Sequence, residues 1–228
     1  MSRDKYNGRK KGKIKRRNKK LYLKVIGLFL MVFGICFLVY PLLTNLYTNY
    51  GQRELRQEWE EEKKNNQDAE DPVIHIEITE VAPTEITTQT QPQKIPSSMK
   101  IIIPKIGLDV MVVEGTEKAD LKKGPGHMKG TAYPGENGTC VISGHRTTYG
   151  ASFNKIEKLV KGDEIILETP DNRYTYYVRE LKVVKPTDTW VVKQTPTPTL
   201  VLTTCHPPRS AAERLIIFAD FDEERALY

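Results

Sequence analysis

The apolar residues of the chain are concentrated first in one long run near the N-terminus. This run, Leu21–Leu46, is interrupted by a single charge, Lys24. About 20 mostly apolar residues allow a helix to cross the hydrocarbon layer of a membrane, and this run exceeds that length. Tyr22, Tyr40 and Tyr47 lie near its ends, where aromatic side chains favour the membrane interface. The pattern therefore predicts one transmembrane helix.

From Met99 onward the pattern becomes that of a β domain. Short runs of β-branched and aliphatic residues alternate with turn signals such as Pro134-Gly135 and Lys161-Gly162-Asp163. Two short helical patches are expected, near residues 119–122 and 152–159. The expected strands cover residues 100–106, 108–113, 139–142, 164–169, 174–184, 199–204 and 214–219. Many short strands separated by turn residues indicate a mostly β fold, with the strands forming a closed or nearly closed barrel.

The segment between the apolar run and the β domain follows neither pattern. Residues 48–71 are rich in Glu, Gln, Arg and Lys, with little apolar surface apart from Leu55 and Trp59. We expect a solvated juxtamembrane helix or stalk there, in preference to a partner-binding helix. Residues 72–98 alternate Thr, Pro, Gln and Glu, a composition that cannot bury a core and predicts an extended linker. A short strand over residues 73–78 is the alternative within that linker.

Four segments follow from these patterns. They are a basic tail over 1–20, a transmembrane anchor over 21–47, a charged stalk and linker over 48–98, and the β domain over 99–228.

The net charge of +6 is concentrated in the basic tail. Residues 1–24 hold twelve Lys or Arg against one acid, Asp4, which gives +11 and leaves −5 for the remaining residues. A nucleic-acid-binding domain carries its basic residues across its folded face, so we exclude nucleic acid as a partner. The basic residues before Leu21 predict a cytoplasmic N-terminus and an extracellular position after residue 50. A cleaved signal peptide is disfavoured, because bulky Tyr40-Pro41-Leu42 stands where small residues are needed.

The chain has three cysteines, Cys36, Cys140 and Cys205, and the first lies in the expected membrane span. No CxxC pair or His-rich cluster occurs in the sequence, so we expect no metal site. The simplest expectation for Cys140 is a packed strand residue. A Cys140–Cys205 disulfide is compatible with an oxidising exterior, and the sequence leaves it open.

Cys205 is the strongest candidate for chemistry. It ends the run Leu200-Val201-Leu202-Thr203-Thr204, and Pro207-Pro208 prevents the strand from continuing. A cysteine at a strand end is held on a rigid element with its sulfur at the surface, which suits a nucleophile. The alternative is a small apolar residue in the core. A thiol nucleophile also needs a basic or cationic partner that favours its thiolate.

Among the four histidines, His145 is the best placed partner for that thiol. It follows the expected strand 139–142 through Gly144, so two strand ends on one barrel rim would bring it to Cys205. His75 lies in the linker, and His127 lies among glycines in an expected loop. His206 follows Cys205 directly, and adjacent strand residues point to opposite faces. The third candidate is Arg214, at the start of the last expected strand. Its guanidinium is suited to hold an oxyanion by charge-assisted hydrogen bonds.

Together these residues resemble the signature of the sortase family. The resemblance rests on Thr203-Thr204-Cys205, on Arg214 nine residues later and on Gly144-His145-Arg146. It covers roughly residues 99–219 and includes Ile103-Pro104-Lys105-Ile106-Gly107-Leu108. The piece from Cys205-His206-Pro207 to Arg214 is similar to the class E and class D sortases, with class E closer. One departure is Asn137-Gly138, where the family commonly has Gly-Asn, and we interpret it as a turn variation.

The resemblance implies an eight-stranded sortase barrel with Cys205 as nucleophile, His145 as general acid/base and Arg214 as the oxyanion and substrate partner. It also implies cleavage of an LPxTG-like sorting signal after Thr and transfer of the surface protein to an amine of a cell-wall precursor on a Gram-positive cell. No cofactor is required by this motif. Anchoring is favoured over pilin polymerisation, because Asp71-Pro72 is followed by Val73 rather than by the aromatic residue of a lid.

Further residues receive weaker assignments. Thr204, Ser143, Tyr149 and His206 are expected to line the substrate cleft, and Arg146 is expected to pair with Glu136 or Asp163. Two other functions stay open from the residues alone. One is a cysteine peptidase that only hydrolyses, and the other is a non-catalytic β domain that binds peptides.

Overall fold

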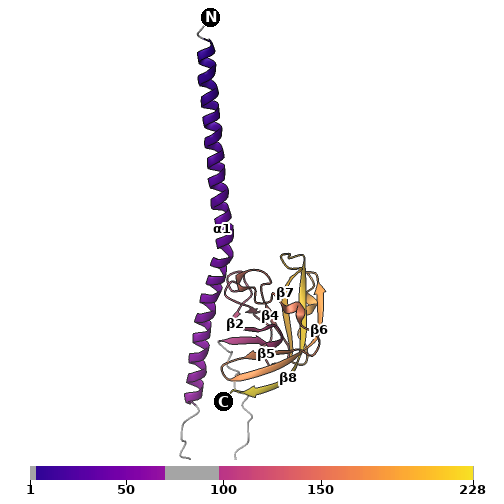
Figure 1. Cartoon of the computed structure of the whole chain (residues 1–228). Coiled ribbons are helices and arrows are strands. Elements are labelled where there is room, and N and C mark those ends of the chain that lie inside the picture. Colours follow the sequence, from indigo (N-terminus) through magenta and orange to yellow (C-terminus); the bar gives the residue numbers. More distant parts are fainter. Residues whose placement is uncertain (1–3, 70–97, 228) are drawn as a thin grey trace, which may run out of the picture. The chain divides into compact units, whose positions relative to one another are not determined.

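The computed structural model describes residues 4–69 and 98–227 (Figure 1). Most of the predicted linker, including the alternative strand over 73–78, lies outside these described residues. The chain divides into two compact units, Met1–Leu43 and Thr44–Tyr228. One helix, α1 (Asp4–Ala69), contributes to both.

The first unit holds the apolar part of α1. Among the described residues, one helix is long and apolar enough to cross a membrane by length and composition. Its large apolar side chains, such as Phe29, Phe33 and Phe37, are exposed in this unit. A helix with exposed apolar side chains on all sides suits a lipid environment, as the sequence predicted.

The second unit contains a closed barrel of eight strands, which confirms the predicted mostly β fold. The strands are β1 (Met99–Ile103), β2 (Leu108–Glu114), β3 (Gly126–His127), β4 (Thr139–Ser143), β5 (Glu164–Glu168), β6 (Asn172–Val184), β7 (Thr199–His206) and β8 (Glu213–Ala226). Their order around the barrel is β1-β2-β3-β4-β7-β8-β6-β5. Most neighbours are antiparallel, whereas β4 runs parallel to β7 and β2 runs parallel to β3.

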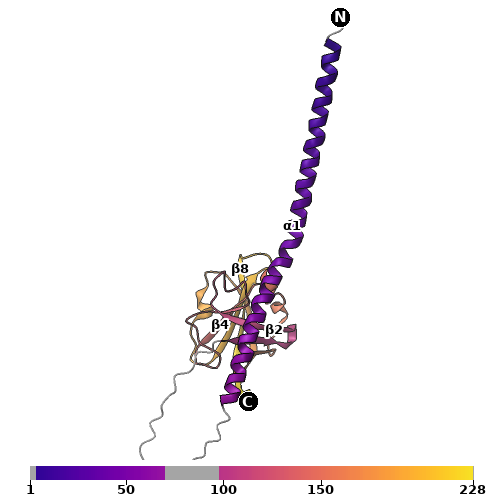
Figure 2. The same ribbon diagram turned by 90° about the vertical axis from the view of Figure 1, so that its left-hand side faces the viewer.

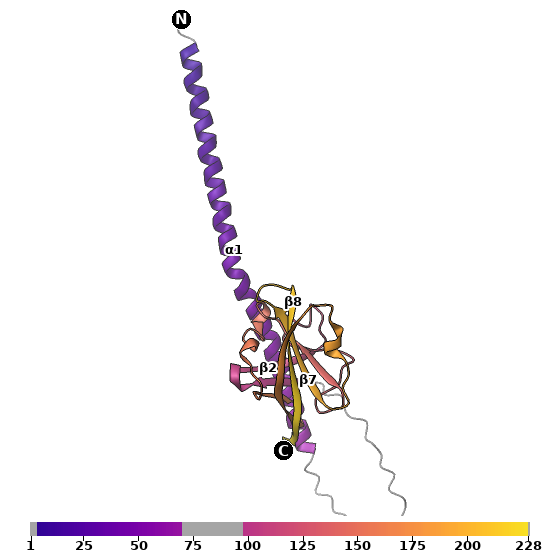
Figure 3. The ribbon, with the colours of Figure 1, turned by 90° about the vertical axis from the view of Figure 1, so that its right-hand side faces the viewer.

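Residues on successive positions of the strands face two different environments. Leu200 and Leu202 of β7 belong to the main core inside the barrel, whereas Val201 belongs to a second apolar cluster on the outer face. This second cluster includes Ile216 and Phe218 of β8 and is covered by the short 3₁₀ helix η4 (Thr189–Val192). The period of two that defines a strand therefore separates an inner from an outer apolar face. Figure 3 shows β7 and β8 on the side turned toward the viewer.

Several local predictions differ from the structure. His127 lies in the two-residue strand β3 rather than in a loop, with Nδ1 2.8 Å from Glu114 Oε2. The expected helical patches form a turn near residue 120 and the 3₁₀ helices η2 (Tyr149–Ala151) and η3 (Ile156–Lys158). Buried Arg146 pairs with Glu157, at 2.9 Å, and the predicted partners Glu136 and Asp163 are wrong.

Residues 44–67 of α1 pack against the barrel, which differs from the solvated stalk that the sequence indicated. Gln52 exchanges two hydrogen bonds with the backbone of Met111 in β2, at 2.7 and 2.9 Å. The Arg56 guanidinium lies 2.8 Å from Asp109, and Trp59 is only 3% exposed. Figure 2 shows this part of α1 crossing the barrel beside β2. The interface is largely polar, so hydrophobic periodicity could not reveal it.

Candidate functional site

The register of three neighbouring strands brings the predicted catalytic residues to one end of the barrel. In the antiparallel pair β7/β8, Cys205 lies directly opposite Arg214. In the parallel pair β4/β7, Ser143 lies beside Thr203, and the Gly144 N–H donates to the Thr203 carbonyl at 3.0 Å. The chain then continues by one residue to His145, so the imidazole emerges near the strand end that carries the thiol.

Cys205 and Arg214 share the outer face of the barrel. Val201 of β7 and Ile216 of β8 belong to the outer cluster. Cys205 lies four residues after Val201 and Arg214 lies two residues before Ile216, so each is on the same face of its strand as that neighbour. Directly opposed residues in a sheet have Cβ atoms about 4.5–5.5 Å apart, which places the sulfur within reach of a flexible guanidinium. Both residues are half-buried, so they remain accessible to a bound molecule.

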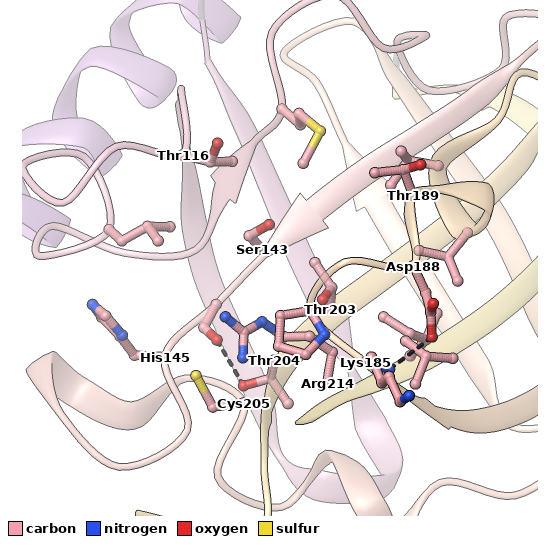
Figure 4. Close-up of a pocket in the computed structure, with 18 residues that line it drawn as sticks. Thr116, Ser143, His145, Lys185, Asp188, Thr189, Thr203, Thr204, Cys205 and Arg214 are labelled. Carbon is pink, nitrogen blue, oxygen red and sulfur yellow. Dashed lines mark hydrogen bonds between the residues drawn. The ribbon is translucent and has the colours of Figure 1, made fainter. Parts of the chain in front are cut away.

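A cleft of about 370 Å³ lies on this face and includes all three predicted catalytic residues in its lining (Figure 4). Ser143, Gly144 and His145 line it from the end of β4, and Thr203, Thr204 and Cys205 line it from β7. Its other walls come from Val184–Pro186 with η4, and from the segment containing Thr116 and Leu121. A concave site with mixed apolar and polar lining is typical of a ligand-binding cleft.

Thr204 belongs to the lining of the cleft but is almost fully buried, and its hydroxyl supports the neighbouring backbone. Its side chain is 3% exposed and its hydroxyl donates to the Gly144 carbonyl at 2.7 Å, shown by a dashed line in Figure 4. A Cβ on Gly144 would lie 2.5 Å from the Phe153 ring, so glycine is needed for this close packing. The backbone just before His145 is thus fixed by a buried hydrogen bond and by the core.

His145 occupies a half-buried position, and burial lowers the pKa of its imidazole below the ordinary value. Its ring centroid lies 5.5 Å from that of Tyr149. Its backbone carbonyl accepts a hydrogen bond from the Phe153 N–H at 3.1 Å. A neutral imidazole in the same cleft as a thiol is suited to proton transfer at neutral pH.

Arg214 is oriented by its own backbone surroundings. One guanidinium nitrogen, Nη1, donates to the carbonyls of Ala211 and Glu213 at 3.1 and 3.0 Å. These bonds hold the side chain at the start of β8, on the face where Cys205 lies. A guanidinium has five N–H donors, so the group retains capacity to donate to a substrate oxygen.

Cys140 and Cys205 are both free, so the disulfide left open by the sequence is not formed. Cys140 faces the barrel interior, as predicted for a packed strand residue, whereas Cys205 faces outward. Burial raises the pKa of the Cys140 thiol strongly, which disfavours its thiolate.

The remaining predicted cleft residues divide into two groups. Ser143 and Thr204 line the cleft, whereas Tyr149 and His206 do not belong to its lining. His206 has the parity of the interior face, and its buried Nδ1 has no hydrogen-bond partner among the described residues. Thr116, Leu121 and the wall at 184–192 had no signal in the sequence, because segments far apart in the chain form these parts of the cleft. Across the described residues, no group of three His, Cys, Asp or Glu side chains is arranged to hold a metal ion.

Comparisons with known proteins identify the family of the chain. The family model described as "Sortase domain" matches residues 101–222. Sortase D of Bacillus subtilis (strain 168) is 41% identical over 120 residues, which are 51% of this chain and 59% of that protein. The chain thus spans less than two thirds of that relative. Sortase A of Listeria monocytogenes is 24% identical over 208 residues, covering 90% of this chain and 93% of that protein.

Solved structures give the same result. Sortase E from Streptomyces avermitilis is similar with a TM-score of 0.53 and 34% identity, covering 57% of this chain and 90% of that chain. A Clostridium perfringens sortase D5 transpeptidase has a TM-score of 0.55 and 28% identity, covering 78% and 99% of the two chains. The chain belongs to the sortase family, whose members are cysteine transpeptidases, and its likeness to classes D and E agrees with the resemblance in its sequence.

Proposed function

We propose that this protein is a membrane-anchored transpeptidase in which Cys205 attacks a sorting signal, His145 transfers protons and Arg214 stabilises the oxyanion. The observation that carries the proposal is the register of β7 and β8, which sets Cys205 opposite Arg214 in the same cleft as His145. Sulfur, imidazole and guanidinium supply the three roles that acyl transfer by a thiol requires.

In the acylation step, the Cys205 thiolate attacks the carbonyl carbon of the Thr residue in an LPxTG-like signal. The carbonyl oxygen becomes an oxyanion, and the Arg214 guanidinium donates hydrogen bonds to it. The C–N bond to the following residue then breaks, and the His145 imidazolium gives its proton to the leaving amine. The product is a thioester between Cys205 and the Thr carbonyl, with His145 neutral.

In the second step, an amine attacks the thioester carbonyl and Cys205 leaves as thiolate. Neutral His145 accepts the proton that the attacking nitrogen loses, which restores the starting protonation state. One amide bond has been exchanged for another, so no oxidant, metal or cofactor enters the balance. We propose that the amine belongs to a cell-wall precursor and that the acyl group belongs to a secreted surface protein.

The burial of His145 limits the fraction of molecules in the protonation state that acylation requires. Because its imidazole has a lowered pKa, only a minority of molecules at neutral pH carry the imidazolium needed for acylation. We propose that the reactive form is the pair of thiolate and imidazolium, and that the neutral pair is the resting form.

The membrane arrangement is part of the proposal. The apolar helix near the N-terminus would span the cell membrane once. The basic residues before Leu21 would keep the N-terminus in the cytoplasm, which puts the barrel outside the cell, where secreted substrates and cell-wall amines occur.

Product analysis tests the proposal directly. The full-length chain in detergent is incubated with an LPxTG peptide, with and without triglycine, and the products are separated by mass. We expect an amide adduct between the Thr carboxyl group and triglycine. Free acid as the sole product at every amine concentration would favour a hydrolytic cysteine peptidase. No turnover of any peptide in a set that varies the second position would contradict the enzymatic role.

A further inference from the structure

The segment of α1 from Asn45 to Gln52 contacts two loops beside the cleft. Gln52 Nε2 donates to the Lys123 carbonyl at 2.9 Å, and the Thr48 hydroxyl donates to the Lys122 carbonyl at 2.8 Å. Both carbonyls follow Leu121, which lines the cleft. The buried Thr48 hydroxyl thus satisfies a carbonyl of this first loop, and α1 fixes its backbone.

The second loop follows His145 and has an unusual backbone. Tyr149, Gly150 and Ala151 have φ values of 48°, 74° and 45°, all in the left-handed region. Tyr149 and Ala151 carry side chains that disfavour this region, so the loop must be held by its surroundings. On one side it is held by the core, through the Phe153 N–H bonded to the His145 carbonyl.

On its other side the second loop is held by α1. The Gly150 N–H donates to Asn45 Oδ1 at 3.2 Å. A Cβ at Gly150 would lie 3.0 Å from Thr48 Cγ2, so the helix and the loop are in close contact there. Lys122, whose carbonyl binds Thr48, also places its ammonium 5.7 Å from the centre of the Tyr149 ring, which lies beside His145.

We propose that Asn45 and Thr48 of α1 are positioning residues for His145, acting through Gly150 and Tyr149. The inference rests on the proposed function, because it assigns a task to the helix in the same reaction. Neither residue lines the cleft, so neither touches the substrate there. Their effect comes from holding the left-handed turn, and with it the Tyr149 ring, against the imidazole.

A matched set of variants of the full-length chain in detergent tests this inference. Asn45→Ala with Thr48→Ala removes both contacts to the loops, whereas Asn45→Asp with Thr48→Ser keeps an acceptor oxygen and a hydroxyl. Arg56→Ala is the control. Arg56 lies on the same helix as Asn45 and Thr48, but its guanidinium contacts Asp109 of β2 and neither of the two loops. Asn45→Ala alone, at an exposed position, provides a variant that retains the buried Thr48.

We expect the double alanine variant to lower kcat for acyl transfer about three- to tenfold, with KM changed less than twofold, since one or two hydrogen bonds are lost. Asn45→Ala alone is expected to lower kcat about twofold to threefold. The conservative double variant and Arg56→Ala are expected to stay within twofold of the wild type. In parallel, the His145 titration midpoint measured by NMR should rise in the alanine variants, because a looser loop admits water to the ring.

Equal kcat and equal His145 midpoints in the double alanine, conservative and Arg56→Ala variants would overturn the inference. An equal loss in the conservative and the alanine variants would also overturn it, since the retained polar atoms would then be irrelevant. Absence of acyl transfer in the wild type would instead contradict the proposed function, and the NMR titration would still test the positioning of His145.

Discussion

Cys140 and Cys205 lie on neighbouring paired strands, β4 and β7, but in opposite environments. Cys140 is 1% exposed among the apolar residues of the barrel interior, and burial raises the pKa of its thiol. Cys205 is half-buried and lines the outer cleft together with His145 and Arg214. The two thiols have the same intrinsic chemistry, so their surroundings alone distinguish them.

The difference between the two thiols follows from the alternation of side chains between the inner and the outer face of each strand. On β7 the interior positions carry Leu200, Leu202 and Thr204, which pack or bond internally, while the alternate positions carry Val201, Thr203 and Cys205. A shift of register by one residue would exchange the two sets and bury the proposed nucleophile. The rigid ladder therefore decides which thiol a peptide can reach.

Removing each thiol separately gives the largest expected contrast. Cys205→Ala should reduce acyl transfer by about 10³-fold or more, because no nucleophile remains in the cleft. Cys140→Ala should leave kcat within about twofold and lower the free energy of unfolding by about 1 kcal/mol, as expected for a small loss of core packing. Peptide transfer assays and thermal unfolding of both variants measure this contrast. Comparable losses of activity in the two variants would contradict it.

Much of this contrast was predictable from the sequence. Local signals, namely runs of β-branched and aliphatic residues bounded by turn residues, predicted three strands that the structure contains. They are the strand ending near Cys205, the strand before His145 and the strand starting near Arg214. The strand pairing was not predictable from these signals, because β4 pairs with β7 across a long sequence separation. The alternation of residues assigns the two faces of each strand, but it does not show which strands and loops come together to form the cleft.

The packing of residues 44–67 against the barrel was the least predictable part of the fold. Thr48, Gln52 and Arg56 follow one another at helical spacing, and each bonds to the barrel through polar atoms. A hydrophobic stripe marks a packed helix in a sequence, whereas a polar stripe looks the same as a solvated face. The sequence therefore indicated a helix there without indicating its partner.

Replacing Arg214 sharpens the comparison within the cleft. Arg214→Ala should lower kcat about 10²-fold, because the oxyanion loses its guanidinium donor, and Arg214→Lys should recover only part of this loss. The matched control is Arg179→Ala, which removes an exposed guanidinium from β6 that pairs with Asp220. Steady-state kinetics should show a change below twofold for the control. Equal rates for Arg214→Ala and the wild type would refute the assigned role.

The smallest expected effect concerns the pKa of His145. Burial favours the neutral imidazole, so its titration midpoint should lie below the ordinary value of about 6.5. Tyr149→Ala should admit water to the ring and move the midpoint upward, whereas Tyr149→Phe should leave it nearly unchanged. NMR titration of His145 measures both midpoints. A wild-type midpoint above the ordinary value would contradict the proposed effect of burial.

Trapping of the acyl-enzyme tests the central claim most directly. The full-length protein is mixed with an LPxTG peptide without added amine, quenched in acid, digested and analysed by mass spectrometry. We predict that the acyl fragment ending in Thr is attached to Cys205 as a thioester, and that it is absent from Cys205→Ala. An acyl group on Cys140, or turnover by Cys205→Ala at the wild-type rate, would contradict the account.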